Sequence, residues 1–183
     1  MVLTTYKWNL RRYHQAIDAG IFDDDRPIEL LDGELIVMPP EREAHAYHNS
    51  EMGDYLRDRL GRRAKIRESH PITLADDSEP CPDLAICQPL GQTYRDRHPS
   101  PDNIYWIVEF SNATLEKDLH QKKELYGRSG ILEYWVVDLK NRQLHRFIDL
   151  EDSEYTTEQI LTEGTVSPLA FPDLKIEVGR FLR

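Results

Sequence analysis

Two acidic residues lie at the ends of apolar segments, where a carboxylate is unusual. Glu109 follows the apolar run 105–108, and an ionised carboxylate beside a core is costly unless it is paired or bound to a metal ion. Asp83 opens another apolar run, at residues 84–86. Two acids at the ends of neighbouring strands can together hold a hard cation such as Mg²⁺. The simpler alternatives place Glu109 in water past the sheet edge and make Asp83 a turn residue.

A lysine follows Glu109 at a spacing that can bring it back to the two acids. Asp118, Lys122 and Tyr126 are spaced at i, i+4 and i+8, so in a helix they share one face. A short loop would fold this helix over the strand of Glu109 and point the Lys122 ammonium at the carboxylates, which suits a site that also binds phosphate. From spacing alone, a surface Asp118–Lys122 pair worth about 0.3–0.5 kcal/mol is the simpler interpretation.

Four further residues are weaker candidates. Glu29 and Glu34 flank a predicted turn, and either could reach the site as a third acid, although a solvated hairpin edge is favoured for Glu34. His45 and His48 are spaced i, i+3, but two histidines without a third ligand make a poor zinc site, so an ordinary helix face is favoured. His45 could instead bind a substrate phosphate or deliver a proton.

The elements that must position these residues are predicted from periodicity and turn signals. Helices are expected at residues 10–19, 45–60 and 115–127. Asn9 and Thr114 are the expected N-caps of the first and third helix. Asp32-Gly33 between two apolar runs predicts a β-hairpin. Its strands are expected at residues 28–31 and 35–38.

Two segments, residues 105–110 and 134–138, are apolar on both faces and are therefore predicted to be central, buried strands. Shorter strands are expected at residues 65–67, 72–74, 84–86, 144–147, 155–160 and 174–178. This order of elements predicts an α/β or α+β fold, a mixed sheet flanked by helices. With 183 residues, the chain 1–183 is expected to form one domain.

The charge of the chain restricts its partners. It has 33 acidic and 23 basic residues, a net charge of −10, which argues against binding polyanions by bulk charge. A nuclease is compatible with this charge if a local basic rim faces the substrate. One cation-rich stretch could supply that rim, but a solvated helix face and turn is the favoured interpretation. The stretch contains Arg57, Arg59, Arg62, Arg63, Lys65 and Arg67.

Targeting signals and cysteine content give an expected location. The N-terminal stretch lacks the apolar core of a secretory signal, and no apolar run approaches the roughly 18 residues of a membrane span. Cys81 and Cys87 are too few for a disulfide framework or a four-cysteine zinc site. We therefore expect a cytoplasmic protein with reduced thiols and no membrane partner.

Several motifs, in their order and spacing, resemble those of one protein family. They are Pro82-Asp83, VEFSNAT at 108–114, the D-xxx-K-xxx-Y pattern of Asp118, Lys122 and Tyr126, EYWVVD at 133–138, and IELLDGELIVMPP at 28–40 followed by His45. With these motifs the chain resembles the Uma-two (Uma2) family of endonucleases (domain of unknown function 820, DUF820). That family belongs to the PD-(D/E)XK superfamily of restriction-endonuclease-like folds. The resemblance extends from about residue 6 to residue 182.

The resemblance implies an acidic site for Mg²⁺, with Mn²⁺ as a substitute. Asp83 matches the aspartate of the PD motif, and Glu109 matches the D/E position. Ser111 stands where the simplest pattern has its lysine, and Lys122 fits the place on the next helix to which the family moves that lysine. The neighbouring Lys123 would point about 100° away on the helix.

Together these observations predict a metal-dependent endonuclease that hydrolyses phosphodiester bonds of nucleic acid, with DNA as the favoured substrate. Glu29 and His45 also match positions that recur in the family, in its first hairpin and second helix. The alternative is a catalytically silent module on the same fold that binds nucleic acid or protein. By analogy with the fold alone, cutting both strands of DNA suggests a homodimer.

Overall fold

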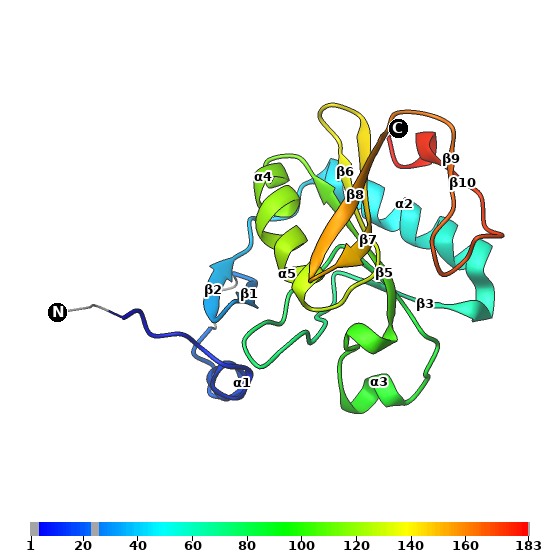
Figure 1. Cartoon of the computed structure of the whole chain (residues 1–183). Helices are drawn as coiled ribbons and strands as arrows, with labels where there is room; N and C mark the ends of the chain where they lie inside the picture. The colour runs from blue at the N-terminus through cyan, green and yellow to red at the C-terminus, as the bar shows by residue number, and fades with distance from the viewer. Residues whose placement is uncertain (1–3, 23–25, 183) are drawn as a thin grey trace.

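The computed structural model describes residues 4–22 and 26–182 and is built around one large β-sheet (Figure 1). In chain order, the elements are α1 (Leu10–Asp18), β1 (Ile28–Leu31), β2 (Glu34–Val37), α2 (Glu43–Leu60), β3 (Lys65–Glu68), β4 (Leu84–Cys87), α3 (Thr93–Asp96), β5 (Ile104–Ser111), α4 (Leu115–Lys117), α5 (Lys123–Arg128), β6 (Tyr134–Asp138), β7 (Gln143–Glu151), β8 (Glu154–Leu161), β9 (Thr165–Val166) and β10 (Ile176–Glu177). A π-helical turn, Asp118–Lys122, joins α4 to α5, and 3-10 turns span Gly61–Arg63, Pro101–Asn103 and Val178–Arg180. In the described part of the chain, no helix combines the length and apolar character that a membrane span requires.

Six strands form the main sheet, in the order β3-β4-β5-β6-β7-β8. β5 and β6 pair in parallel, and the helical segment between them crosses over one face of the sheet. Every other neighbouring pair is antiparallel. α2 covers one face, and α4 with α5 covers the other (Figure 1). The predicted mixed sheet flanked by helices is therefore confirmed.

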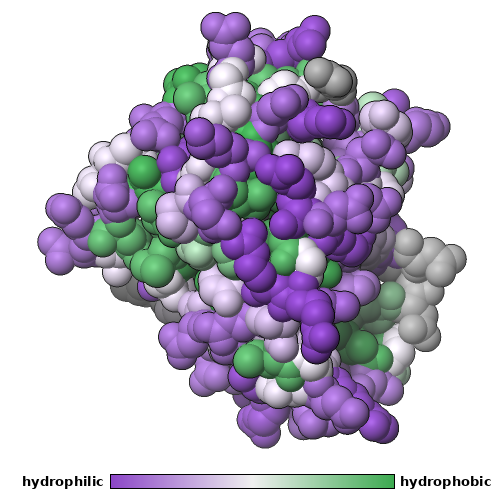
Figure 2. Space-filling model, turned by 90° about the vertical axis from the view of Figure 1, so that its right-hand side faces the viewer, coloured by the Kyte–Doolittle hydropathy of each residue, from purple (hydrophilic) through white to green (hydrophobic). Residues whose placement is uncertain are grey.

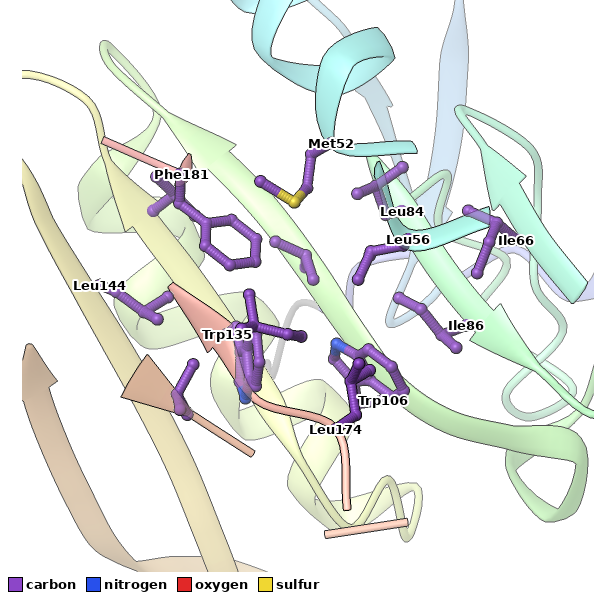
Figure 3. Close-up of a cluster of buried hydrophobic side chains, with 14 of the residues drawn as sticks. Met52, Leu56, Ile66, Leu84, Ile86, Trp106, Trp135, Leu144, Leu174 and Phe181 are labelled. Carbon is purple, nitrogen blue, oxygen red and sulfur yellow. The ribbon is translucent and has the colours of Figure 1, made fainter. Parts of the chain in front are cut away.

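Strand residues alternate between two apolar layers, as the pleat of a sheet requires. Trp106, Val108 and Phe110 of β5 belong to the layer that α2 and the C-terminal segment cover. Figure 3 shows Trp106 of this layer together with Leu56 of α2 and Phe181 of the C-terminal segment. Ile107 belongs to the opposite layer, beneath α5. Glu109 is the next residue in that second series, so the alternation turns its carboxylate toward the side of α4 and α5.

Local signals in the N-terminal part specify a helix start and a turn. Asn9 caps α1, because its side-chain oxygen accepts a hydrogen bond from the backbone N–H of Arg12 at 3.0 Å. Asp32 and Gly33 have φ angles of +52° and +71°, and left-handed backbone at both positions is what a two-residue hairpin turn requires. β1 and β2 pair across this turn. Both predictions are confirmed.

Two local predictions are wrong. Residues 72–74 form no strand, because the backbone N–H groups of Ile72, Thr73 and Leu74 donate to carbonyls of three separate loop residues rather than to one neighbouring strand. Thr114 makes no capping hydrogen bond with its side chain, since its backbone lies near φ −94° and ψ 2°, outside the extended conformation of an N-cap residue.

A buried ion pair ties the C-terminal segment to the sheet. Glu133, just before β6, is fully buried and accepts hydrogen bonds from Nε of Arg146 at 2.7 Å and Nε1 of Trp135 at 2.8 Å. It also accepts one from the backbone N–H of Leu169 at 2.6 Å. Arg146 donates in turn to the carbonyl oxygen of Ser167 at 2.9 Å. The pair therefore anchors the segment that follows β8.

We expect the Glu133→Ala protein to lose about 3–5 kcal/mol of unfolding free energy, because the substitution leaves the Arg146 guanidinium buried without its carboxylate. Urea titration measures this loss. The control is Glu158→Ala, which removes a 43% exposed carboxylate paired with His145 and should cost at most about 1 kcal/mol. Equal losses of unfolding free energy in the two variants would show that the buried pair stabilises the fold no more than an exposed pair does.

Candidate active site

Asp83 and Glu109 lie beside each other on adjacent strands. The antiparallel register of β4 and β5 pairs Leu84 with Val108, so the next position along places Asp83 opposite Glu109. The backbone nitrogen of Asp83 lies 3.4 Å from Oε2 of Glu109. Oδ2 of Asp83 accepts a hydrogen bond from the backbone N–H of Phe110 at 2.6 Å. Both acids are buried, and a cation beside them would favour their ionised forms.

The crossover helix brings an amine and a phenol to the same carboxylate. Nζ of Lys122 and the hydroxyl of Tyr126 both donate to Oε1 of Glu109, each at 2.8 Å. Lys123 instead lies over the ring of Phe147, with Nζ 4.8 Å from the ring centroid. The structure therefore brings Lys122, and not Lys123, to the acid pair.

The π-helical turn changes which residues of this helix share a face. In a regular α-helix, Lys117 and Lys122 are five residues apart and would point about 140° away from each other. The i→i+5 bonding of a π-turn turns both lysines toward one carboxylate, that of Glu29. Within the turn, Asp118 accepts a hydrogen bond from Oγ of Ser111 at 2.7 Å, and its Oδ1 lies 3.9 Å from Nζ of Lys122.

Glu29 is fully buried and serves the two lysines. Its Oε1 lies 2.8 Å from Nζ of Lys117, and its Oε2 lies 3.9 Å from Nζ of Lys122. The backbone N–H of Cys81 donates to Oε2 at 3.3 Å. Burial acts to raise the pKa of Glu29, but Lys122 and Lys117 outweigh it and hold the pKa below its usual value. Glu29 is thus an ionised partner of the lysines, not a free ligand.

His45 of α2 reaches the acid pair from the other side. Its Nε2 lies 3.1 Å from Oδ2 of Asp83, and its Nδ1 lies 2.9 Å from Oε1 of Glu41. The hydrogen bond with Asp83 raises the pKa of His45 to about 9, against the effect of burial. Both ring nitrogens are therefore engaged, and the imidazole is cationic at neutral pH.

Two other candidates lie outside these contacts. The ring of His48 stacks on Phe110, with the ring centroids 6.2 Å apart. The Glu34 side chain is 56% exposed and lies 2.6 Å from Nζ of Lys7, so this acid forms a surface ion pair on the hairpin. The structure does not bring either residue to the acid pair.

The cluster around Glu109 contains four acidic and three basic side chains. Its four buried carboxylates face two lysines and one histidine. They are Glu29, Asp83, Glu109 and Asp118, against Lys117, Lys122 and His45. Burial raises the pKa of Glu109 to about 8; Lys122 opposes this rise and Asp83 adds to it. Burial disfavours the charged form of Lys122, yet Glu109 and Glu29 hold its pKa well above the usual value. With all seven groups charged, one negative charge would be in excess. The raised pKa of Glu109 means that a proton takes up this excess at neutral pH, and a bound cation would displace that proton.

The oxygen atoms of Asp83 and Glu109 fit a hard cation such as Mg²⁺. Oδ1 of Asp83 accepts no hydrogen bond from the described residues, and Oε2 of Glu109 has only the 3.4 Å contact given above. Mg²⁺ is commonly held by one or two carboxylates, with water and substrate oxygens in its other positions. Among residues 4–22 and 26–182, no three or more His, Cys, Asp and Glu side chains are grouped to hold a metal ion. Asp83 and Glu109 each offer a carboxylate oxygen that accepts no short hydrogen bond from the described residues.

The sequence does not predict the contacts that Lys117 makes with Glu29 and Ser111 makes with Asp118. Ser111 is interpreted from the sequence only as the position that lacks a lysine, although it lies two residues after Glu109 and so shares its face of β5. That alternation could have indicated its contact with Asp118. Lys117 had no such signal, because only the π-turn brings it beside Lys122.

Comparisons with known proteins give a family and a fold. The family model described as "Uma2: Putative restriction endonuclease" matches residues 10–179. The chain is similar to the crystal structure of "a putative nuclease belonging to DUF820 from Anabaena variabilis ATCC 29413", with a TM-score of 0.64 and 14% sequence identity. The similarity covers 86% of this chain and 90% of that one. At this identity the likeness establishes the fold alone. No curated protein matches the chain.

Proposed function

Because the chain belongs to the Uma2 family of putative restriction endonucleases, we propose that it is a nuclease that hydrolyses phosphodiester bonds of DNA with Mg²⁺ or Mn²⁺. One observation carries this proposal. Asp83, Glu109 and Lys122 are distant in sequence but converge, with Lys122 2.8 Å from Glu109 and Asp83 beside Glu109 on the next strand. Paired carboxylates and a fixed amine are what metal-assisted phosphodiester hydrolysis requires.

Each of these residues has a distinct proposed role. Asp83 and Glu109 would hold the ion through Oδ1 of Asp83 and Oε2 of Glu109, the oxygens that accept no short hydrogen bond from the described residues. The chemistry that Mg²⁺ supplies at such a site is polarisation of the phosphate and a lowered pKa of bound water. Lys122 would orient the attacking water and offset the charge that develops on the phosphate oxygens. Tyr126 would fix the rotamer of Glu109, since it donates to the same oxygen as Lys122.

Two charged residues would position the others. His45 would hold Asp83 in place, because its two ring nitrogens are engaged by Asp83 and Glu41. Glu29 would hold Lys122 toward Glu109 from the opposite side. One such site cuts one strand, so we propose that two copies of the chain act together when both strands of a duplex are cut.

Supercoiled plasmid DNA incubated with the protein and Mg²⁺ is expected to become nicked and then linear, and gel electrophoresis measures the rate. Excess EDTA should abolish the conversion, and added Mg²⁺ or Mn²⁺ should restore it, because the acid pair alone supplies no polarising charge. The absence of cleavage with either ion, together with no heat of Mg²⁺ binding in calorimetry, would contradict the proposal. That result would favour the catalytically silent module on the same fold.

A further inference from the structure

The cation-rich stretch 57–67 extends from the last turn of α2 into β3, and five of its six cations fall into two groups in the structure. Arg59 donates to the carbonyl oxygen of Lys175 at 3.2 Å, and Arg63 lies 2.7 Å from Oδ2 of Asp173. These two arginines fasten the C-terminal segment. Other cations of the stretch instead line a surface pocket, namely Arg57, Lys65 and Arg67.

The pocket lies between the edge strand β3 and α3 and has a volume of about 620 Å³. Arg95 of α3 adds a fourth cation to its lining. β3 is the last strand of the sheet on this side. The side of the molecule that carries β3 and the C-terminal end of α2 faces the viewer in Figure 2, where hydrophilic residues predominate and apolar areas are scattered among them.

Most of the charge on this pocket is uncompensated. Arg57 is neutralised by Glu68, the acidic residue of the lining. Lys65, Arg67 and Arg95 form no ion pair with an acid in the described part of the chain. On a chain with a net charge of −10, three such cations around one pocket create a local positive potential that attracts an anion.

Arg67 is held rigidly at this pocket. Its guanidinium lies over the ring of Tyr94, 5.8 Å from the centroid, and donates to the carbonyl oxygen of Pro71 at 3.3 Å. Its Nε is buried without a hydrogen-bond partner among the described residues, and an unpaired buried donor costs about 1–3 kcal/mol. Its contacts with Tyr94 and Pro71 fix the guanidinium at the pocket, and a preorganised side chain loses less entropy when it binds an anion.

The C-terminal end of β3, which lines the pocket, lies beside the residue Asp83 of the acid pair. In the β3–β4 register Glu68 pairs with Leu84, and the backbone N–H of Ser69 donates to the carbonyl oxygen of Asp83 at 3.0 Å. β3 has 4 residues, or about 13 Å at roughly 3.3 Å per residue. That length matches about four phosphate steps of duplex DNA, at roughly 3.4 Å of axis per step. A nucleic-acid strand that continues from a phosphate at Asp83 along β3 would pass these cations.

We propose that Lys65, Arg67 and Arg95 bind the phosphate backbone of the nucleic-acid substrate beside the scissile phosphate. This inference rests on the proposed nuclease function and identifies the surface that its substrate contacts. Phosphate contacts fix the position of a nucleic acid without reading its sequence. The exposed side chains of Lys65 and Arg95, with the half-buried Arg67 in the same pocket lining, suit that task.

The test is the affinity for a fluorescein-labelled duplex, measured by fluorescence anisotropy in EDTA at several salt concentrations. At about 100 mM salt, the Lys65→Ala/Arg95→Ala protein is expected to bind at least about tenfold more weakly than the unchanged protein. Its salt slope should fall by about 2, because each lost phosphate contact removes about 0.9. Both side chains are exposed, so thermal unfolding should stay unchanged. DNA and RNA duplexes of one sequence identify which backbone the pocket holds.

The matched control is Arg62→Ala/Lys175→Ala, which removes two exposed charges outside the pocket lining and should keep nearly the original affinity and salt slope. An equal loss in control and pocket variants would overturn the inference, as would unchanged binding by the pocket variant or no binding of either duplex by the unchanged protein. The binding measurement needs neither a metal ion nor cleavage. A negative result would therefore exclude this binding surface without excluding the proposed nuclease activity, which the plasmid assay tests separately.

Discussion

The Asp83→Asn protein is expected to cleave plasmid DNA at least about 100-fold more slowly than the unchanged protein in Mg²⁺. Residues that only orient metal ligands already change metal affinity or activity by about 10–100-fold, and Asp83 would be a ligand itself. Asparagine keeps the shape of the side chain and can still accept the hydrogen bond from the N–H of Phe110, 2.6 Å away. The initial rate of nicking measures the effect, and calorimetry should show a parallel loss of Mg²⁺ affinity.

Glu34→Gln is the control for this substitution. It removes an acid that is exposed and paired with Lys7 on the hairpin, so cleavage and Mg²⁺ affinity should stay within about twofold of the unchanged protein. If Asp83→Asn cleaves DNA as fast as Glu34→Gln does, Asp83 holds no catalytic ion.

Lys122→Met is expected to lower the single-turnover rate of cleavage by about 100- to 1,000-fold at saturating Mg²⁺. This is the range found when one fixed donor is removed from a site where charge develops in the transition state. Methionine has a similar volume but no charge. Because Lys122 contacts the carboxylate through Oε1 of Glu109, the other oxygen should still bind Mg²⁺, so the loss should appear in the rate more than in metal affinity.

Lys123→Met is the matched control, since it removes the adjacent lysine, which lies over Phe147, and should leave the rate nearly unchanged. Removing Lys122 also breaks a buried ion pair, which can cost about 3–5 kcal/mol of stability. Lys122→Arg, which keeps the charge, therefore serves as a second variant and should recover part of the rate. Unchanged single-turnover cleavage by a folded Lys122→Met protein would exclude the proposed role of this lysine.

The frame of the site follows from local sequence features. Residues 105–110 carry apolar side chains on both faces of the predicted strand. This pattern predicts a central strand, and β5 lies inside the sheet with both faces covered. Alternation along this strand then predicts that Glu109 shares the face of Ile107, which is where the crossover helix lies. The Asp32-Gly33 turn likewise specifies the hairpin that carries Glu29. The alternation of side chains along a strand and the residue preferences of a tight turn depend on neighbouring residues only. Both can therefore be recognised in a single sequence.

Some features of the fold and the site cannot be predicted from the sequence, because they depend on which strands pair and on an irregular turn within a helix. Residues 72–74 have the composition of a strand, but strand formation requires a neighbouring strand. Their N–H groups instead donate to carbonyls in two loops, at residues 78 and 80 and at residue 99. The π-turn that turns Lys117 and Lys122 toward Glu29 follows no 3.6-residue period. The meeting of Asp83 with Glu109 depends on the β4–β5 register, which distant packing determines.

The most direct test of the central claim is an anomalous difference map from crystals of the protein grown with Mn²⁺. The account predicts a peak between the side chains of Asp83 and Glu109, about 2.1 Å from a carboxylate oxygen of each, that disappears in crystals of Asp83→Asn. An ion bound only elsewhere on the protein, or no peak between these two carboxylates at saturating Mn²⁺, would contradict it.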